Sequence, residues 1–186
     1  YIVGASLGPL QHLLDQSLLS KTGAERYVLH RTIHAFAQQK LQRWPEYIET
    51  LQVQYVHFYL AFLARQEREL TGAGYAVAIE QIQADLDNVQ TAWRRAITYN
   101  MVTELNRCVE ALFLFSEQHR FYLGVINLYE EAMHHFSSQQ AQQNHQSSAE
   151  ITLLLGRLQA YWGSRLARLG RFQQAQAAYD ASWSTL

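Results

Sequence analysis

The chain has 186 residues, of which 48% are apolar and 17% are charged, and its formal net charge is −1. That length fits one large domain or two small ones, at about 100–200 residues per domain. A chain so near neutrality has no overall field to attract nucleic acid or anionic lipid. The single cysteine, Cys108, excludes an internal disulfide and suits a reducing compartment.

The start of the sequence and its apolar runs bear on its location. No signal peptide opens the chain, and no apolar run reaches the roughly 18–20 residues that a membrane-spanning helix needs. These features predict a cytoplasmic protein without a membrane partner. Because the chain starts at Tyr1, without Met and within an apolar pattern, we expect it to be a piece of a longer protein.

The first 42 residues predict a helix, a β-hairpin and a second helix. Pro9 lies where a first helical turn accepts proline, and leucines follow it at helical spacing. Between Ser17 and His30, two short apolar runs flank a turn with Gly23, which is typical of a hairpin. A helix is expected over Arg31 to Leu41. Its apolar face would consist of Ile33, Phe36, Ala37 and Leu41.

From Pro45 to Phe136 the pattern predicts only helices. The first should end at the TGAG segment that starts at Thr71, and its apolar stripe comprises Leu51, Tyr55, Phe58 and Phe62. The second is expected to be one helix with the stripe Ile79, Ile82, Leu86, Val89, Trp93 and Ile97. The third carries Val102, Leu105, Cys108, Leu112 and Phe115. A fourth begins near Phe121 and ends by Phe136.

The segment from Ser137 to Ser148, SSQQAQQNHQSS, is polar and of low complexity. It has no large apolar side chain to anchor it, so we predict a disordered, mobile loop over residues 137–148. Two final helices are expected over residues 149–169 and 171–185.

The last hairpin, YWGSRLARLGRFQQAQAAYDASW, resembles the tetratricopeptide repeat, a helix–turn–helix unit of about 34 residues. Gly163 stands where two helices must approach closely, and Gly170 stands at the turn. Phe172, Ala175 and Tyr179 are expected to face their own hairpin.

A weaker copy of the same spacing lies 50 residues upstream, and the glutamine-rich loop accounts for the excess over the usual repeat length. The copy consists of Tyr122, Val125, Tyr129 and Ala132. The alternative is an ordinary α-bundle in which the small residues coincide.

Two further segments resemble bacterial signal-transduction ATPases of the STAND class, which include regulators related to the antibiotic-regulatory and maltose-regulon activators. LLDQSLLSKTGAERYVLHRTIHAFAQQKL is similar to the end of their winged-helix domain. ADLDNVQTAWRRAI is similar to a segment between that domain and the repeats. The resemblance implies a nucleotide-binding domain before Tyr1 and more repeats after Leu186.

Together these features predict an all-α fold with one small β-hairpin. A winged-helix remnant would occupy residues 1–42 and a linking helical hairpin residues 43–100. Right-handed tetratricopeptide-like hairpins would occupy residues 101–186, with the loop at 137–148 inside them.

Nucleotide hydrolysis by this chain is not expected, because the sequence has no phosphate-binding loop of the G-x-x-x-x-G-K-[ST] form. We therefore predict no cofactor for this segment. The STAND resemblance implies ATP or ADP in the parent protein, with His30 contacting the bound diphosphate. Arg31 stands where that family often has an acidic residue. The alternative is that His30 caps or flanks a helix start.

Other site chemistries find little support in the sequence. The first helix would present Gln11, His12, Asp15 and Gln16, which include no cation to position DNA. Two pairs, His30 with His34 and Glu131 with His134, have helical metal-ligand spacing but lack the further ligands that a metal needs. No nucleophile arrangement is recognisable, so we predict neither direct nucleic-acid binding, nor a metal, nor an enzyme.

The function predicted is a non-catalytic regulatory and interaction module, whose helical groove binds a protein or peptide partner. The alternative is a sensor that binds a small inducer in the same groove. The last helix is expected to expose Ala178, Ala181 and Trp183 and to form a homodimer. Alternatively, Trp183 folds back on its own hairpin and the chain stays monomeric.

Overall fold

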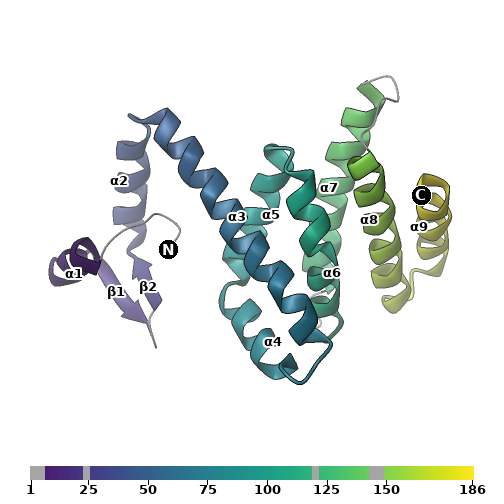
Figure 1. The fold of residues 1–186 in the computed structure, drawn as a ribbon, viewed down its shortest axis with the longest axis horizontal. Coiled ribbons are helices and arrows are strands. Elements are labelled where there is room, and N and C mark those ends of the chain that lie inside the picture. The colour runs from purple at the N-terminus through teal and green to yellow at the C-terminus, as the bar shows by residue number, and fades with distance from the viewer. Residues whose placement is uncertain (1–6, 23–25, 119–121, 143–148) are drawn as a thin grey trace. The chain divides into compact units, whose positions relative to one another are not determined.

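A computed structural model describes residues 7–22, 26–118, 122–142 and 149–186 of the chain. These residues are helical apart from one antiparallel β-hairpin, which confirms the predicted fold class at this level (Figure 1). By their internal contacts they separate into two compact units, residues 1–55 and 56–186. The division falls inside a helix, between Tyr55 and Val56.

The first unit contains helix α1 (Leu7–Asp15), strands β1 (Leu19–Thr22) and β2 (Arg26–Leu29), and helix α2 (Arg31–Leu41). The hairpin pairs Leu19 with Leu29, as the two apolar runs predict. Its turn, with Gly23, lies outside the described residues.

Little of this unit is buried. Leu19 is the one buried apolar side chain among its described residues. The expected apolar face of α2 has no buried residue, and Phe36 on it is 56% exposed. A two-stranded hairpin and two short helices provide too few layers to cover that face.

Helix α3 (Pro45–Leu70) begins at its proline, as predicted, and continues from the first unit into the second. Its buried face differs from the expected stripe. The buried residues are Val56, Leu60, Leu63 and Leu70. Phe58, on the expected stripe, is 40% exposed.

The helix expected around Ile79 to Ile97 is two helices, α4 (Tyr75–Ala84) and α5 (Leu86–Thr98). Asp85 separates them with a φ of −113° and a ψ of 13°, outside the helical region. Its side chain accepts a hydrogen bond from Asn88 Nδ2 (3.1 Å). The single-helix prediction was wrong because both halves keep the same inward stripe, so periodicity alone does not reveal the break.

Helix α6 (Val102–Gln118) buries the whole predicted stripe. Helix α7 (Tyr122–Gln142) begins where expected but passes Phe136, so the predicted loop is wrong for residues 137–142. Glutamine and alanine are good helix formers, and Ser138 Oγ bonds to the His134 carbonyl (2.8 Å). The rest of the predicted loop, residues 143–148, lies outside the described residues.

Helices α8 (Ala149–Arg168) and α9 (Phe172–Thr185) form the expected final hairpin. Gly170 has a φ of +76°, and the N–H groups of Gly170 and Arg171 bond back to Ala167 (3.0 Å) and Leu166 (2.9 Å). This is the helix-ending pattern that favours glycine. Helix α8 packs against α9, α7 and α6, which makes it the centre of this part of the core (Figure 1).

The inward face of α9 agrees with the prediction at Ala175 but not at Phe172. Phe172 is 71% exposed and Tyr179 is 40% exposed, whereas Ala175, Ala178 and Ser182 are buried. The two helices approach closely at Gly163, where an added Cβ would lie 3.1 Å from the Ala178 Cβ and 3.2 Å from the Tyr179 ring. The close approach predicted at Gly163 is therefore confirmed.

The outer face of α9 follows from the same packing. Trp183 is 89% exposed, so its predicted outward orientation is correct and the alternative in which it folds back is wrong. Ala178, expected outside, faces α8 instead.

Candidate interaction surface

Helices α6 and α8 meet along a row of polar and aromatic contacts. At one end Thr103 Oγ1 donates to a Glu150 carboxylate oxygen (2.9 Å), and Asn106 Nδ2 donates to the Glu150 carbonyl (2.9 Å). Both α6 residues lie on one helical face, three positions apart. The row therefore follows one face of α6 along its length.

Arg157 lies in the middle of this row. Its Nη1 donates to the Asn106 carbonyl (2.6 Å) and its Nη2 to Glu110 Oε2 (3.2 Å). The same guanidinium lies 5.9 Å from the centre of the Tyr161 ring. Burial raises the pKa of Tyr161, while its hydrogen bond with Arg157 acts in the opposite direction.

The row ends in a buried cation. The rings of Tyr161 and Phe113 stack with centroids 4.5 Å apart, and the Arg165 guanidinium lies 4.0 Å from the Phe113 centroid. Glu117 Oε1 accepts from both Arg165 (3.0 Å) and Arg168 (3.3 Å). The Arg165 side chain is fully buried, so the Glu117 carboxylate compensates a cation that water does not reach.

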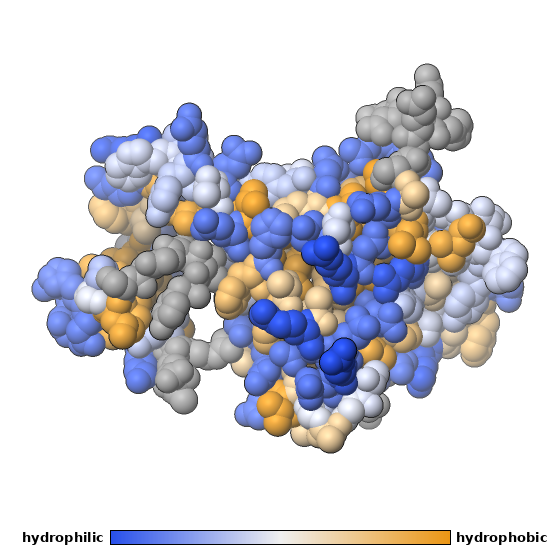
Figure 2. Space-filling model, viewed as in Figure 1, coloured by the Kyte–Doolittle hydropathy of each residue, from blue (hydrophilic) through white to orange (hydrophobic). Residues whose placement is uncertain are grey.

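A groove of about 730 Å³ lies between α3 and α6. Its lining is mostly charged and, among the described residues, includes no aromatic side chain. The charged residues are Arg65, Glu67, Arg68, Glu69 and Glu110. In Figure 2 strongly hydrophilic side chains gather on the visible face where α3 and α6 lie. Since Glu110 also pairs with Arg157, the groove and the α6–α8 row are continuous.

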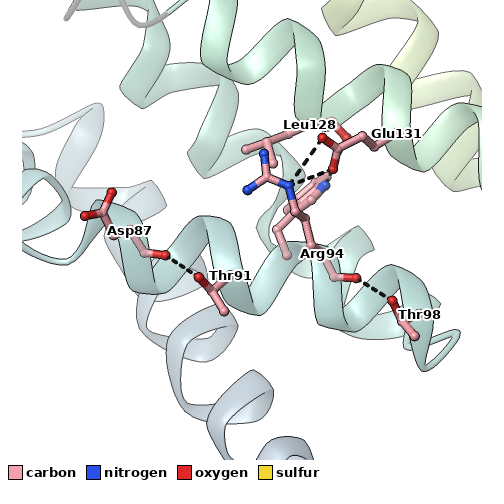
Figure 3. Close-up of polar contacts among 7 residues, drawn as sticks. Asp87, Thr91, Arg94, Thr98, Leu128 and Glu131 are labelled. Carbon is pink, nitrogen blue, oxygen red and sulfur yellow. Dashed lines mark hydrogen bonds and ion pairs between the residues drawn. The ribbon is translucent and has the colours of Figure 1, made fainter. Parts of the chain in front are cut away.

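Helix α5 anchors α7 through a buried and an exposed contact (Figure 3). The Trp93 Nε1–H donates to the Leu128 carbonyl (3.1 Å) inside the core, and Arg94 pairs with Glu131 at the surface (2.9 Å). Next to Leu128, Tyr129 donates its hydroxyl proton to the Val109 carbonyl of α6 (3.1 Å). These bonds tie α5, α7 and α6 together.

His30 lies at the start of α2, where its Nδ1 accepts the backbone N–H of Thr32 (3.4 Å). The helix-capping interpretation of this histidine is confirmed. Its contact with nucleotide in a longer parent stays a prediction.

The other sequence candidates are not brought together into sites. The Glu131 carboxylate is engaged by Arg94 rather than placed with His134 for a metal. In the described part of the chain, no group of three or more His, Cys, Asp or Glu side chains could hold a metal ion. On α1, Gln11 bonds to Asp15 (2.9 Å). Cys108 is buried, and burial raises its pKa, which disfavours the reactive thiolate.

Sequence reasoning did not single out the α6–α8 row. The signal was present as helical spacing, with Arg157, Tyr161 and Arg165 four residues apart on one helix. Glu110, Phe113 and Glu117 follow at three and four on the other. Because both sets mix charged and aromatic residues, neither forms the apolar stripe by which a buried helical face is predicted from sequence.

No helix among the described residues combines the length and apolar character needed to cross a membrane. No family model matches the chain, and no curated protein or solved structure matches it either.

Proposed function

We propose that residues 56–186 form a non-catalytic interaction module that binds an extended peptide segment of a partner protein. The peptide would lie in the groove between α3 and α6. The observation that carries this proposal is the lining of that groove, where the described residues offer arginine and glutamate side chains and no aromatic wall.

Two arginines give the groove a specific chemistry. Arg65 and Arg68 are exposed on α3, and no carboxylate of the described residues forms an ion pair with either. An arginine fork binds a carboxylate through two parallel hydrogen bonds. The neighbouring Glu67 and Glu69 would accept a basic side chain, so a peptide with charges of both signs fits best.

The small-inducer alternative fits the groove less well. Sites for small molecules are mostly apolar and enclose most of the ligand. Here the lining is mostly charged, and its apolar part among the described residues consists of Ala64 and Leu114.

The wider assignment follows the STAND resemblance. We propose that the chain is a regulatory arm of such an ATPase, with a winged-helix remnant over 1–42 and tetratricopeptide-like hairpins over 101–186. Support comes from the β-hairpin followed by His30 and α2, and from the close α8–α9 crossing at Gly163. In that assignment the protein acts in the cytoplasm, and ATP or ADP binds to a preceding domain.

Selection from a library of random short peptides tests the groove. Peptides that bind the whole chain should carry acidic residues and should lose at least about tenfold in affinity with Arg65→Glu/Arg68→Glu, about 1.4 kcal/mol. The charge-matched control is Arg31→Glu/Arg43→Glu, which changes two other exposed arginines and should leave the affinity for these peptides unchanged. Selected peptides that bind both variants equally, or a selection without binders, would contradict the proposal.

A further inference from the structure

A second hollow adjoins the groove, between the end of α3 and the start of α4. Its volume is about 480 Å³, within the range of clefts that hold ligands. Arg65 and Glu69 on α3 line both the groove and this hollow, so the two sites meet at these side chains. A peptide that lies in the groove beside Arg65 therefore reaches the hollow without leaving the surface of α3.

The α4 wall of the hollow is small and apolar. Gly74, directly before α4, and Ala78 lie one helical turn apart and line it together with Val77, whose side chain is 57% exposed. The Glu69 carboxylate lies against Gly74, where an added Cβ would collide with it. The Glu69 side chain thus fills the part beside Gly74, which leaves Val77 as the exposed apolar side chain among the described lining residues.

Two polar side chains that line the hollow are paired with each other. Gln66 Nε2 donates to Gln81 Oε1 between α3 and α4 (3.0 Å). Covering amides with an apolar group costs less when their hydrogen bond is already made than when they are unpaired. The hollow therefore differs from the charged groove, because its exposed wall favours an aliphatic or aromatic side chain over a further charge.

We propose that the hollow binds an apolar side chain of the same peptide that places an acidic side chain on Arg65. This inference rests on the proposed peptide-binding function and specifies the sequence that the peptide carries. In an extended chain, residues two apart point to the same side and lie about 6.6–6.8 Å from each other. Two adjacent sites that share one arginine side chain match that spacing. The bound motif is therefore acidic–x–apolar, in either chain direction, with the middle side chain directed to solvent.

The peptides selected on the whole chain test this motif. Those whose binding requires Arg65 and Arg68 should carry an aliphatic or aromatic residue two positions from an acidic one. Replacing that apolar residue with serine should weaken binding at least about fivefold. Moving it to one or three positions from the acidic residue should cause the same loss, because it then points to the opposite side. Arginine-dependent peptides without this preference would overturn the inference and leave the proposed function intact.

A pair of protein variants tests the apolar contact itself. Val77→Ser should weaken the binding of acidic–x–apolar peptides at least about fivefold. It should not affect the serine-substituted peptides, because these no longer make the contact. The matched control is Ala76→Ser, which changes an exposed neighbour on α4 outside the described lining and should leave both affinities unchanged.

Fluorescence anisotropy of labelled peptides measures these affinities, and circular dichroism verifies that both variants are folded. If Val77→Ser leaves the affinity for acidic–x–apolar peptides unchanged, or weakens the serine-substituted peptides equally, the hollow does not bind the apolar side chain and the inference is wrong. Binding that Arg65→Glu/Arg68→Glu leaves unchanged would refute the proposed function and this motif together.

Discussion

The guanidinium group of Arg165 lies 4.0 Å from the centre of the Phe113 ring, in a side chain that is fully buried between helices. A buried cation is costly unless its charge is compensated. Phe113 offers the negative face of its ring, and Glu117 supplies a full negative charge 3.0 Å away. The α6–α8 contact thus depends on electrostatic pairing as well as on apolar burial.

Removing the Glu117 carboxylate should destabilise the fold. Glu117→Gln keeps the shape of the side chain but leaves Arg165 with less compensation inside the core. We expect a loss of about 2 kcal/mol in the free energy of unfolding, measured with urea, which is below the loss for a fully buried pair because Glu117 is 29% exposed. Glu131→Gln is the control, since its pair with Arg94 is exposed to water on both sides and should change stability by less than about 1 kcal/mol. Equal losses would show that burial of Arg165 does not matter.

The two tryptophans with hydrogen-bonded indoles should differ in their contribution to stability. Trp93 is fully buried and donates to the Leu128 carbonyl, whereas Trp162 is partly exposed and donates to the Glu130 carboxylate (3.1 Å). Trp93→Phe removes the indole hydrogen bond to the Leu128 carbonyl and creates a cavity in the core, so we expect a loss of about 3 kcal/mol.

Trp162→Phe allows water to replace the indole as donor to the Glu130 carboxylate, so the loss in the free energy of unfolding should be about 0.5 kcal/mol. Urea unfolding of the two variants provides the comparison. Similar losses at both positions would mean that the Trp93–Leu128 bond does not anchor α7.

The elements that sequence predicted correctly are those with one strong local signal. Pro45 marks the start of α3, Gly170 marks the turn before α9, and α6 buries every residue of its predicted stripe. In each case a backbone preference or a single apolar face decides the structure.

The predictions that were wrong concern features that tertiary packing determines. Phe172 and Tyr179 were expected inside from the tetratricopeptide resemblance, yet Phe172 is 71% exposed and Tyr179, whose ring lies beside Gly163, is still 40% exposed. The groove and the α6–α8 row were not predicted because they depend on which polar faces lie opposite each other. That pairing is set by helix stacking, which a one-dimensional pattern does not specify.

The α8–α9 crossing should be sensitive to side-chain size at Gly163. A Cβ there would already lie 3.2 Å from the Ala175 carbonyl oxygen, so Gly163→Val must push the two helices apart. We expect a loss of about 2 kcal/mol, the usual cost of overpacking a close-packed core. Gln173→Val, on the exposed side of α9, should cost only a few tenths of a kcal/mol. Thermal or urea unfolding measures both, and a tolerated valine at 163 would contradict the observed helix distance.

High pH should destabilise the protein through two buried groups. Burial raises the pKa of Cys108 and of Tyr129 above their ordinary values, which are about 8.5 and 10. The unfolded chain releases these protons at the ordinary values, whereas the folded chain retains them. The contribution of each group to stability is therefore fully present below its ordinary pKa and decreases as the pH rises above it.

Urea unfolding between about pH 7 and 11 should show this loss in two parts that single substitutions separate. Cys108→Ala should remove the loss of stability that begins at about pH 8.5. Tyr129→Phe should remove the loss that begins at about pH 10. Each variant should lose some stability at pH 7. The relevant quantity is therefore the slope of the free energy of unfolding against pH, rather than that free energy at a single pH. Tyr27→Phe, at an exposed position of the hairpin, should leave the slope as it is in the unmodified chain. If the slope above about pH 10 is the same for Tyr129→Phe and for that control, then the Tyr129 hydroxyl does not carry this dependence, and ionisation elsewhere in the core is responsible.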